Sequence, residues 1–436
     1  MSNKTIIKVF EFDIIKQDKI YDGIKFEKKH LESIQKFNTN NKNKYFTLIH
    51  NGVKFKNYVG VLKIGKLTIE ILPKVDKTLN VNLEVETKES WKIFLLQMLK
   101  KSGFINITSL THANLKLRNT TLLDIYIQEY LKEVTLLLRK GLRKQYRFVE
   151  DNTTALKGRL LFQKQIQKNL IHKERFYTSH QTYDKNHKLN QILLKALNIL
   201  HDIAKPVFID SINRLKLDFP ELDSINVTES TFKSISYNRN NNQYQKAIEL
   251  AKLIILNFSP DIQTGNNNVI AILFDMNDLW EKYVYRLLSK DQIKGNFKVS
   301  YQNRMKFWNN KLIKPDIVLK KEIDGSEKTF IIDTKWKLID SNKPSDNDLK
   351  QMYVYNMYWD SFKSILLYPT NTEQITEYGK FHKGRDEDNL CKLGFLKVYE
   401  GLSDNIKLKE SIYKEINHLL ELDTDNGVVN KNLILQ

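Results

Sequence analysis

The sequence predicts an α+β multidomain protein with a β-rich N-terminal domain (residues 1–115), a helical, basic middle region (116–262) and a C-terminal α/β domain (263–436). The C-terminal domain is expected to have a mixed central sheet flanked by helices. Apolar residues alternate with polar ones near the N-terminus and recur with a helical period through the middle. Two β-branched runs flank Asp324-Gly325, the strongest short-range signal for a hairpin. A chain of 436 residues is long enough for two or three such domains.

Strands dominate the expected N-terminal domain. Residues Tyr58–Ile64 and Leu67–Leu72 alternate as strands, and a helix is expected near Glu89–Lys101. The connection Gly60-x-x-x-x-Gly65-Lys66 matches most of a phosphate-binding P-loop, but Leu67 stands where a Mg²⁺-binding hydroxyl is required. The segment also alternates like a strand instead of opening a helix. We therefore expect this chain to bind no nucleotide.

Two long apolar stripes predict helices in the middle region. One runs from Leu122 to Leu138 and is ended by Gly141, and the other runs from Ile192 to Leu200. The Asn-rich segment 238–243 and the segment Gly265–Asn268 predict loops. The second of these loops is the expected boundary before the C-terminal domain.

Positive charge is concentrated in one part of the chain. The net charge is +19 with a pI near 9.4, and residues 139–188 hold 13 Lys or Arg against 4 Asp or Glu, with aromatic residues interleaved. Such a stretch neutralises phosphates without reading sequence, which predicts a surface that positions double-stranded DNA. The alternative is a solvated basic face beside an ordinary core. The predicted DNA-binding residues are Arg139, Lys140, Arg143, Lys144, Arg147, Lys157 and Arg159.

The C-terminal hairpin is expected to bring two carboxylates and a lysine together. A two-residue turn at Asp324-Gly325 sets Asp316 opposite Asp333, and Lys335 projects from the same face as Asp333. Directly opposed like charges destabilise a hairpin by up to about 1 kcal/mol, so a cation is expected between them. Mg²⁺ suits carboxylate oxygens best, and Mn²⁺ is an expected substitute. The alternative, a surface hairpin with solvated charges, is disfavoured because an apolar run typical of a buried strand ends at Asp333.

Two helices carry further candidate site residues. The first begins near Phe274, with Asp275 or Asn277 as N-cap, and has Glu281 at the edge of its apolar stripe. That carboxylate either is solvated or leans over the adjoining sheet. On the second helix, Gln351 and Tyr355 share one face, which either lines the site or belongs to a polar helix packed against the sheet.

The pattern Pro315-Asp316, then Asp333-x-Lys335, resembles the PD-(D/E)xK nuclease superfamily, and Gln351-x-x-x-Tyr355 resembles the motif that follows in its RecB-like branch. The resemblance implies Mg²⁺-dependent hydrolysis of DNA phosphodiester bonds. The implied catalytic residues are Asp316, Asp333, Lys335, Glu281, Gln351 and Tyr355, and the implied metal ligands are Asp316, Asp333, Glu281 and the Thr334 carbonyl. Whether Lys335 acts as a base or as a charge stabiliser stays open, because carboxylates raise a lysine pKa and bound Mg²⁺ lowers it.

A series of short fragments in a fixed order points to a narrower family. These fragments are Gly60–Gly65, Glu70–Val75, Arg139–Arg143, Leu156–Leu160, Asp184-x-x-His187-x-x-Asn190, Phe274–Asn277 and Leu366–Thr370. Together they resemble McrC, the nuclease subunit of McrBC-type modification-dependent restriction systems, over roughly residues 50 to 370. The resemblance implies an endonuclease subunit that is activated by, and stimulates, a separate McrB-like AAA+ GTPase hexamer that recognises methylated DNA. Residues 1–115 are then expected to bind that GTPase.

Two other functions remain open at this point. The chain could be a non-cleaving activator of the GTPase that holds DNA, although its intact acid, acid and lysine set argues against pure regulation. It could also be a free-standing RecB-like repair nuclease. The single cysteine, Cys391, excludes an internal disulfide framework and is expected to be a small core residue. With no signal peptide and no apolar run near the roughly 18 residues that span a bilayer, the chain is expected to be cytoplasmic and to bind no membrane.

Overall fold

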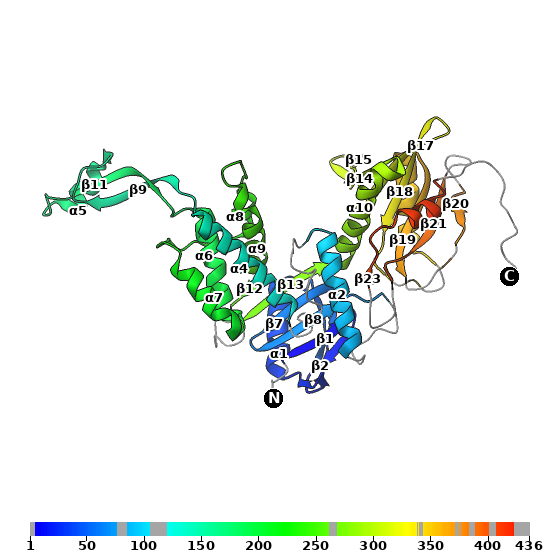
Figure 1. Cartoon of the computed structure of the whole chain (residues 1–436), viewed down its shortest axis with the longest axis horizontal. Coiled ribbons are helices and arrows are strands. Elements are labelled where there is room, and N and C mark those ends of the chain that lie inside the picture. The colour runs from blue at the N-terminus through cyan, green and yellow to red at the C-terminus, as the bar shows by residue number, and fades with distance from the viewer. Residues whose placement is uncertain are drawn as a thin grey trace. The chain divides into compact units, whose positions relative to one another are not determined.

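The computed structural model describes residues 5–75, 85–104, 120–260, 268–337, 339, 343–370, 374, 376–382, 389–400 and 407–422. Contacts within the chain define two compact units (Figure 1). Unit 1 comprises Met1–Gly60, Leu67–Arg118 and Leu273–Gln436, and unit 2 comprises Val61–Lys66 and Asn119–Ile272. Most of the first 118 residues therefore group with the C-terminal part of the chain. Both boundaries expected from the sequence, after residues 115 and 262, lie outside the described residues, as does most of the expected loop Gly265–Asn268.

The N-terminal part of unit 1 is rich in strands, as predicted. Its elements are β1 (Ile6–Phe10), β2 (Ile14–Lys16), β3 (Ile20–Tyr21), β4 (Ile24–Lys25), α1 (Lys28–Asn40), β5 (Phe46–Ile49), β6 (Gly52–Phe55), the first residues of β7 (Tyr58–Ile64), whose remainder is assigned to unit 2, β8 (Leu67–Leu72) and α2 (Val85–Lys101). Strand β8 lies between β1 and β7 in its sheet and is buried along its whole length. The P-loop-like sequence is therefore a strand, a turn with Gly65 at φ 52°, and a second strand.

Unit 2 contains the helices that the apolar stripes predicted. Its elements are α4 (Leu122–Lys140), β9 (Gln145–Thr153), β10 (Arg159–Leu160), α5 (Phe162–Asn169), β11 (Phe176–Asp184), α6 (Lys188–Ile203), α7 (Pro206–Leu217), α8 (Glu229–Lys233), the 3₁₀ helix η2 (Asn242–Tyr244), α9 (Gln245–Leu256), β12 (Phe258–Ser259) and the first residues of β13 (Val269–Asp275), whose end is assigned to unit 1. Helix α4 begins at Thr121, whose side chain accepts a hydrogen bond from the Asp124 backbone N–H. It ends at Gly141, which has φ 86° and so supplies a backbone conformation that other residues rarely adopt.

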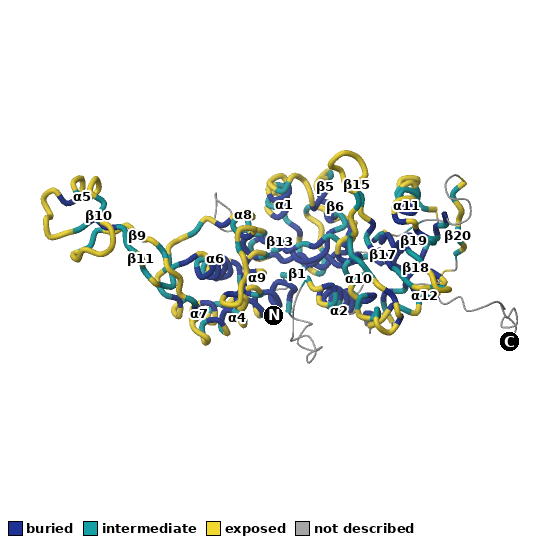
Figure 2. Tube along the Cα trace, turned by 90° about the horizontal axis from the view of Figure 1, so that it is seen from above, coloured by how far each residue is buried: buried dark blue, intermediate teal, exposed yellow. Residues whose placement is uncertain are grey.

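Residues 145–184 contradict the expectation of a helical middle region. Strands β9 and β11 pair antiparallel from Gln145 opposite Asp184 to Thr153 opposite Phe176, and β10 and α5 fill the connection (Figure 1). We call residues 145–184 the arm. Its side chains are mostly exposed or half-buried (Figure 2). The aromatic and β-branched residues in QYRFV fit a pleated strand better than a helix, which explains the difference.

The C-terminal part of unit 1 is built on a mixed six-stranded sheet with the order β14-β17-β18-β19-β21-β20. Its elements are α10 (Met276–Gly295), β14 (Phe297–Tyr301), β15 (Met305–Trp308), β16 (Lys311–Ile313), β17 (Ile317–Ile323), β18 (Ser326–Thr334), α11 (Asp346–Tyr358), β19 (Ser361–Thr370), β20 (Tyr378–Lys380), β21 (Leu390–Lys397), β22 (Tyr399–Glu400), β23 (Lys407–Leu408) and α12 (Tyr413–Leu420). Strands β17 and β18 form the predicted hairpin, with Ile317 opposite Ile332. Both turn residues, Asp324 and Gly325, have positive φ, as a two-residue hairpin turn requires.

Helices cover both faces of this sheet, as predicted. Helix α11 packs against the face that carries Val318, Ile331 and Leu366. The neighbouring residues Ile365 and Leu367 point to the opposite face, because side chains alternate along a strand. Cys391 is buried in the α11 layer, as expected of a small core residue. Among the helices that the structure describes, none is long and apolar enough to cross a membrane.

Candidate active site

The ends of β17 and β18 hold two carboxylates close together. Asp333 is the penultimate residue of β18, is only 1% exposed and lies opposite Leu366 of the parallel neighbour β19. Asp316 directly precedes β17, and its Oδ2 accepts hydrogen bonds from the backbone N–H and the hydroxyl of Thr334, at 2.7 and 2.8 Å. The hairpin register and these two bonds fix both acids at one edge of the sheet.

Lys335 leaves the end of β18 toward both Asp333 and helix α11. Its Nζ lies 2.7 Å from Asp333 Oδ2 and donates to Gln351 Oε1 at 3.1 Å. Gln351 in turn donates to the Tyr355 hydroxyl at 2.7 Å, and that hydroxyl donates to the Lys314 carbonyl at 2.8 Å. The structure therefore places the predicted face of α11 beside the carboxylates, with the helix started by the side chain of its N-cap.

Glu281 lies on the buried side of α10 and not in solvent. The helix begins at the predicted N-cap Asp275, whose side chain accepts from the Asn277 backbone N–H, and its apolar stripe is buried. Glu281 is itself buried and accepts a hydrogen bond from Gln302 Nε2 at 2.9 Å. Of the two readings that the sequence allowed, the carboxylate that leans over the sheet is the observed one.

Burial raises the pKa values of all three carboxylates, and the charge of Asp316 adds to the rise at the other two. Burial, and then the charge of Asp316, raises the pKa of Glu281 to about 7 and that of Asp333 to about 7. Burial also raises the pKa of Asp316, against the hydrogen bonds from Thr334. Burial lowers the pKa of Lys335, but Asp333 and Asp348 outweigh it, so the net shift is upward and the ammonium form is favoured. The site therefore holds buried acids that a second cation would stabilise in their ionised form.

The carboxylate oxygens of Asp316, Asp333 and Glu281 are chemically suitable ligands for a divalent cation. Oxygen ligands and shared negative charge are what Mg²⁺ prefers. In the part of the chain that the structure describes, however, no three Asp, Glu, His or Cys side chains are gathered in a metal-binding arrangement. The carboxylate oxygens are instead held by Thr334, Lys335 and Gln302. A metal at this site would exchange some of these contacts for its own.

Gln302 is a site residue that the sequence motif did not reveal. Besides its bond to Glu281, its Oε1 accepts from Lys314 Nζ at 3.0 Å, and its backbone N–H donates to the Asp316 carbonyl at 2.9 Å. It has a positive φ of 46°, which a non-glycine residue seldom adopts. Gln302 lies between β14 and β15, outside the sequence motifs and outside any periodic pattern. Only the folded structure shows that it contacts Glu281.

A buried contact joins the N-terminal strands to the end of β18. The Trp336 indole N–H donates to Glu11 Oε1 at 2.6 Å, and the Lys74 backbone N–H donates to the same oxygen at 2.7 Å. The Trp336 backbone N–H also donates to Asn277 Oδ1 at 3.2 Å. Burial raises the pKa of Glu11 to about 8, so its carboxyl is mostly neutral at pH 7. Trp336, the residue after Lys335, is thus held by the segment that follows β1 and by the first turn of α10.

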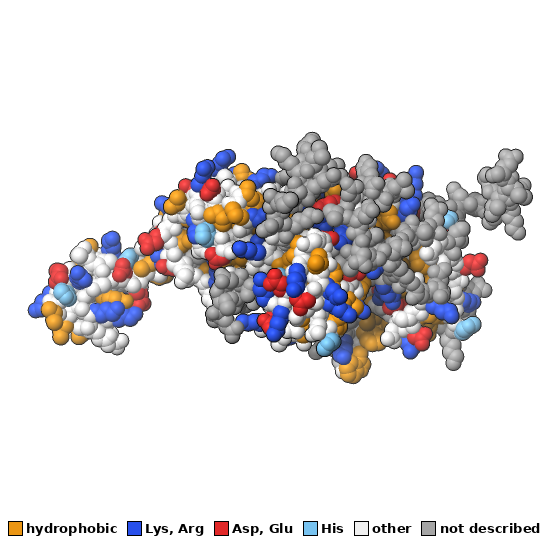
Figure 3. All heavy atoms as spheres, turned by 90° about the horizontal axis from the view of Figure 1, so that it is seen from below, with side chains coloured by type: hydrophobic (Ala, Val, Ile, Leu, Met, Phe, Trp, Pro, Cys, Tyr) orange, Lys and Arg blue, Asp and Glu red, His pale blue; other side chains and the backbone are white. Residues whose placement is uncertain are grey.

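The seven predicted DNA-binding residues lie on unit 2, at the end of α4, in the connection that follows it and on the arm. Arg139, Lys140 and Lys144 are exposed, as are Lys157 and Arg159, whereas Arg143 is half-buried. Arg147 is already engaged, because its Nε lies 2.9 Å from Asp184 Oδ2. Cationic and hydrophobic side chains share the surface of the arm, at the left of Figure 3.

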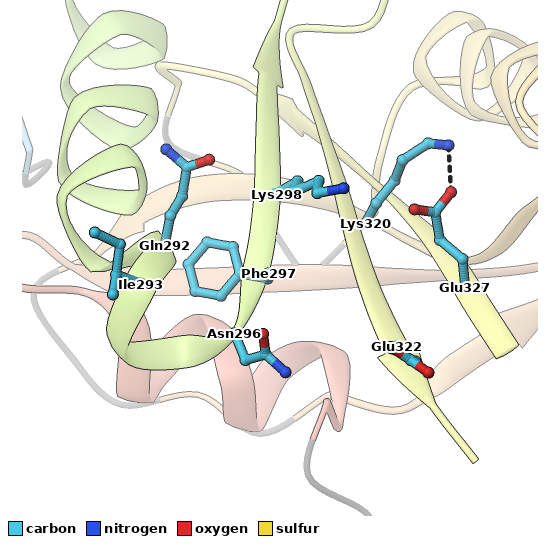
Figure 4. Close-up of a pocket in the computed structure, with 8 residues that line it drawn as sticks. All are labelled: Gln292, Ile293, Asn296, Phe297, Lys298, Lys320, Glu322 and Glu327. Carbon is cyan, nitrogen blue, oxygen red and sulfur yellow. Dashed lines mark hydrogen bonds and ion pairs between the residues drawn. The ribbon is translucent and has the colours of Figure 1, made fainter. Parts of the chain in front are cut away.

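A hollow of about 540 Å³ lies toward the Ile323 end of β17, whereas Asp316 precedes the other end of that strand. Figure 4 shows the residues that line the hollow. Its lining includes Lys320, which pairs with Glu327 at 2.7 Å, and Lys298. Lys320 follows Asp316 by four residues, which is roughly 13 Å along a strand. The hollow is therefore separate from the candidate active site.

Comparison with known proteins agrees with the resemblance read from the sequence. Residues 53–369 match the family described as McrBC 5-methylcytosine restriction system component. The chain is 23% identical over 289 residues to the type IV methyl-directed restriction enzyme EcoKMcrBC of Escherichia coli (strain K12), which covers 60% of this chain and 81% of that protein. Its fold is similar to a chain of a refined half-complex from a tetradecameric assembly of Thermococcus gammatolerans McrB AAA+ hexamers with bound McrC, with a TM-score of 0.65 and 19% identity, over 95% of this chain and 100% of that one.

Proposed function

The chain belongs to the family of McrBC 5-methylcytosine restriction system components, and on that premise we propose that it is the DNA-cleaving subunit of such a system. The reaction would be Mg²⁺-dependent hydrolysis of a DNA phosphodiester bond. The observation that carries this proposal is the meeting of Asp316, Asp333 and Lys335 at one sheet edge. A non-cleaving activator would have no need of buried acids whose ionised forms are destabilised by their surroundings.

The roles of the side chains follow from their positions. Asp316, Asp333 and Glu281 would hold Mg²⁺, with the Thr334 carbonyl as the further ligand expected from the superfamily resemblance. When bound, the ion would polarise the scissile phosphate and lower the pKa of an attacking water. Lys335, kept protonated by Asp333 and Asp348, would stabilise charge that develops on the phosphate. Gln351 and Tyr355 would hold the lysine in place through their chain of hydrogen bonds.

Metal binding at these carboxylates should release protons near neutral pH. The pKa values of Glu281 and Asp333 are both about 7, so a ligand that requires their ionised forms must displace protons below that pH. Titration calorimetry with Mg²⁺ or Mn²⁺ in buffers of different ionisation enthalpy should therefore show proton release that is larger at pH 6 than at pH 8. Affinity should rise over the same interval.

A cleavage assay with the same metal ions tests the proposed function. Chelation should abolish DNA cleavage, and Mg²⁺ or Mn²⁺ should restore it. The double variant Glu281→Gln, Asp333→Asn should lose both the calorimetric signal and cleavage. Metal-independent cleavage, or proton release that this variant retains, would count against the proposed site.

The basic residues at the end of α4 would position DNA. If Arg139, Lys140 and Lys144 contact phosphates, replacing all three with Gln should weaken binding to any duplex and flatten the slope of log affinity against log salt by up to about 3, roughly 0.9 per lost contact. Methylated and unmethylated duplexes should be affected alike, because the modification would be read by the partner. The exposed Arg214 on α7 offers a control, since Arg214→Gln should leave the slope unchanged. An unchanged slope in the triple variant would mean a solvated basic face.

The proposed partner is an McrB-like AAA+ GTPase hexamer that reads methylcytosine-type modification. The arm is a candidate docking element for it, because the arm carries large exposed apolar side chains that phosphate binding does not require. These side chains are Tyr146, Phe148, Leu156, Phe162, Ile166, Leu170, Ile171 and Tyr183. Ile171, for example, is 87% exposed. The competing docking element is the N-terminal β-rich region, which the McrC resemblance implies.

A further inference from the structure

A small hairpin formed by β15 and β16 lies directly before Asp316 in the sequence. Strands β15 and β16 pair antiparallel, with Met305 opposite Ile313 and Trp308 opposite Lys311. They lie between β14 and β17 in the sequence, and β15 is labelled beside β14 in Figure 1. An isolated two-stranded hairpin is marginally stable in water, so its position must be fixed by the rest of the domain.

The base of the hairpin is fixed to the candidate active site. Met305 and Ile313 pack against the core cluster that contains Tyr355. Gln302, just before the hairpin, bonds to Glu281, and the Lys314 carbonyl, just after it, accepts from the Tyr355 hydroxyl. Both ends of the hairpin are therefore bonded to residues of the site.

The tip of the hairpin is exposed. The pairing shifts between Lys306 and Trp308, which leaves Phe307 as the bulged residue, with its ring 5.8 Å from that of Tyr358 on α11. Trp308 comes directly before the turn at Asn309, which has a positive φ of 48°. The Trp308 side chain is 62% exposed, and Lys311 Nζ lies 5.6 Å from the centre of its ring. Phe307 and Tyr358 are exposed as well as Trp308, and aromatic side chains that gather at a surface mark a candidate binding site.

The charge of the hairpin suits a polyanion. Between Gln302 and Pro315 the sequence contains four cations and no Asp or Glu. These cations are Arg304, Lys306, Lys311 and Lys314. The combination of cations with exposed aromatic rings is typical of surfaces that grip a phosphate backbone and stack on bases.

We propose that the β15–β16 hairpin binds the DNA duplex beside the bond that is cut, with Lys306 and Lys311 on phosphates and Trp308 inserted at a base step. This inference rests on the proposed nuclease function. Apolar side chains that enter a base step unstack it and bend the duplex, and stacking on an aromatic ring contributes about 1–3 kcal/mol per base. The hairpin would thus hold the scissile phosphate over the carboxylates by gripping the duplex next to it.

The test compares Trp308→Ala and Trp308→Phe, each in an Asp333→Asn background that prevents cleavage. The probe is a fluorescently labelled duplex of unmodified mixed sequence that contains 2-aminopurine, with and without the GTPase partner. Loss of stacking worth about 1–3 kcal/mol predicts roughly 5- to 150-fold weaker binding for the alanine variant and partial retention for phenylalanine. The rise in 2-aminopurine fluorescence that reports unstacking should disappear with alanine. Ile293→Ala, which removes an apolar side chain that is 95% exposed on α10, should change neither signal.

Failure of the hairpin proposal is distinguishable from failure of the proposed function. If the parent chain cuts DNA with Mg²⁺ and its partner, but Trp308→Ala binds and unstacks the duplex like the parent, the hairpin proposal is wrong and the nuclease function stands. If Trp308→Ala changes only self-association or GTPase binding, the hairpin is a protein contact and the proposal is also wrong. A parent chain that neither binds the duplex nor cuts methylated DNA in the presence of Mg²⁺ and its partner removes the proposed function itself.

Discussion

Asp333→Asn should reduce DNA cleavage by at least about 100-fold, as expected when a metal ligand or charge-stabilising group is lost. Asp316→Asn and Lys335→Ala should have effects of similar size. The reason is geometric: the two acids and the lysine meet at one sheet edge, and each supplies a charge that the proposed chemistry requires. The measurement is cleavage of methylated plasmid DNA in the presence of the GTPase partner, GTP and Mg²⁺.

A matched control is available on the same strand. Glu327 is an exposed carboxylate of β18 that pairs with Lys320 at the far end of the hairpin, so Glu327→Gln should cut at the parent rate. If Asp333→Asn also cuts at the parent rate, Asp333 is not a catalytic residue. Equal losses in Glu327→Gln and Asp333→Asn would indicate damage to the sheet instead of to the chemistry.

Thermal stability separates the two explanations further. The pKa of Asp333 is about 7 in the folded protein, against an ordinary value of 3.8. Between these pH values the folded state therefore binds more protons than the unfolded state. The contribution of Asp333 to stability falls as the pH rises through that window. An asparagine carries no such penalty. Asp333→Asn should therefore unfold at a temperature equal to or above that of the parent at pH 8, with a smaller difference at pH 5. A buried carboxylate whose ionised form lowers the stability of the fold is expected where function requires that negative charge.

The core of the site could be predicted from the sequence because each of its signals is local. Asp324-Gly325 selects a two-residue turn, the turn sets the register, and the register places Asp316 and Asp333 together. Helix α10 is likewise predicted by its N-cap Asp275 and by its apolar stripe. In both cases neighbouring residues decide the geometry, and burial reinforces it.

Contacts between distant segments could not be predicted in this way. The bond between Glu11 and Trp336 joins residues 325 positions apart, and nothing near either residue specifies the other. The arm falls inside the region predicted as helical because the sequences on either side of it have a helical period. Its own residues favour strands, and few of their side chains are buried. Gln302 was missed because its role depends on the fold of the loop that carries it.

Removing the arm should abolish stimulation of the GTPase partner while leaving the rest of unit 2 folded. Arg147 lies opposite Thr182, so residues 148–181 can be replaced by Asn-Gly, which supplies a two-residue hairpin turn at that register. The helices α4, α6 and α9 pack on one another without the arm, so the shortened protein should keep its helical content. We expect stimulation of GTP hydrolysis to fall by at least about 10-fold, because several large apolar side chains that would anchor the partner are lost together.

A milder variant distinguishes an apolar contact from an electrostatic one. Replacing Phe162, Ile166 and Ile171 with Ser removes exposed apolar surface and leaves the cations of the arm in place. If the partner binds this apolar surface, the triple variant should lose most of the stimulation at any salt concentration, since burial of apolar area is little screened by ions. A matched variant with Gln at Lys157, Lys164 and Lys173 should stimulate nearly as well as the parent. Full stimulation by the arm deletion would instead assign GTPase binding to the N-terminal strands of unit 1, as the McrC resemblance implies.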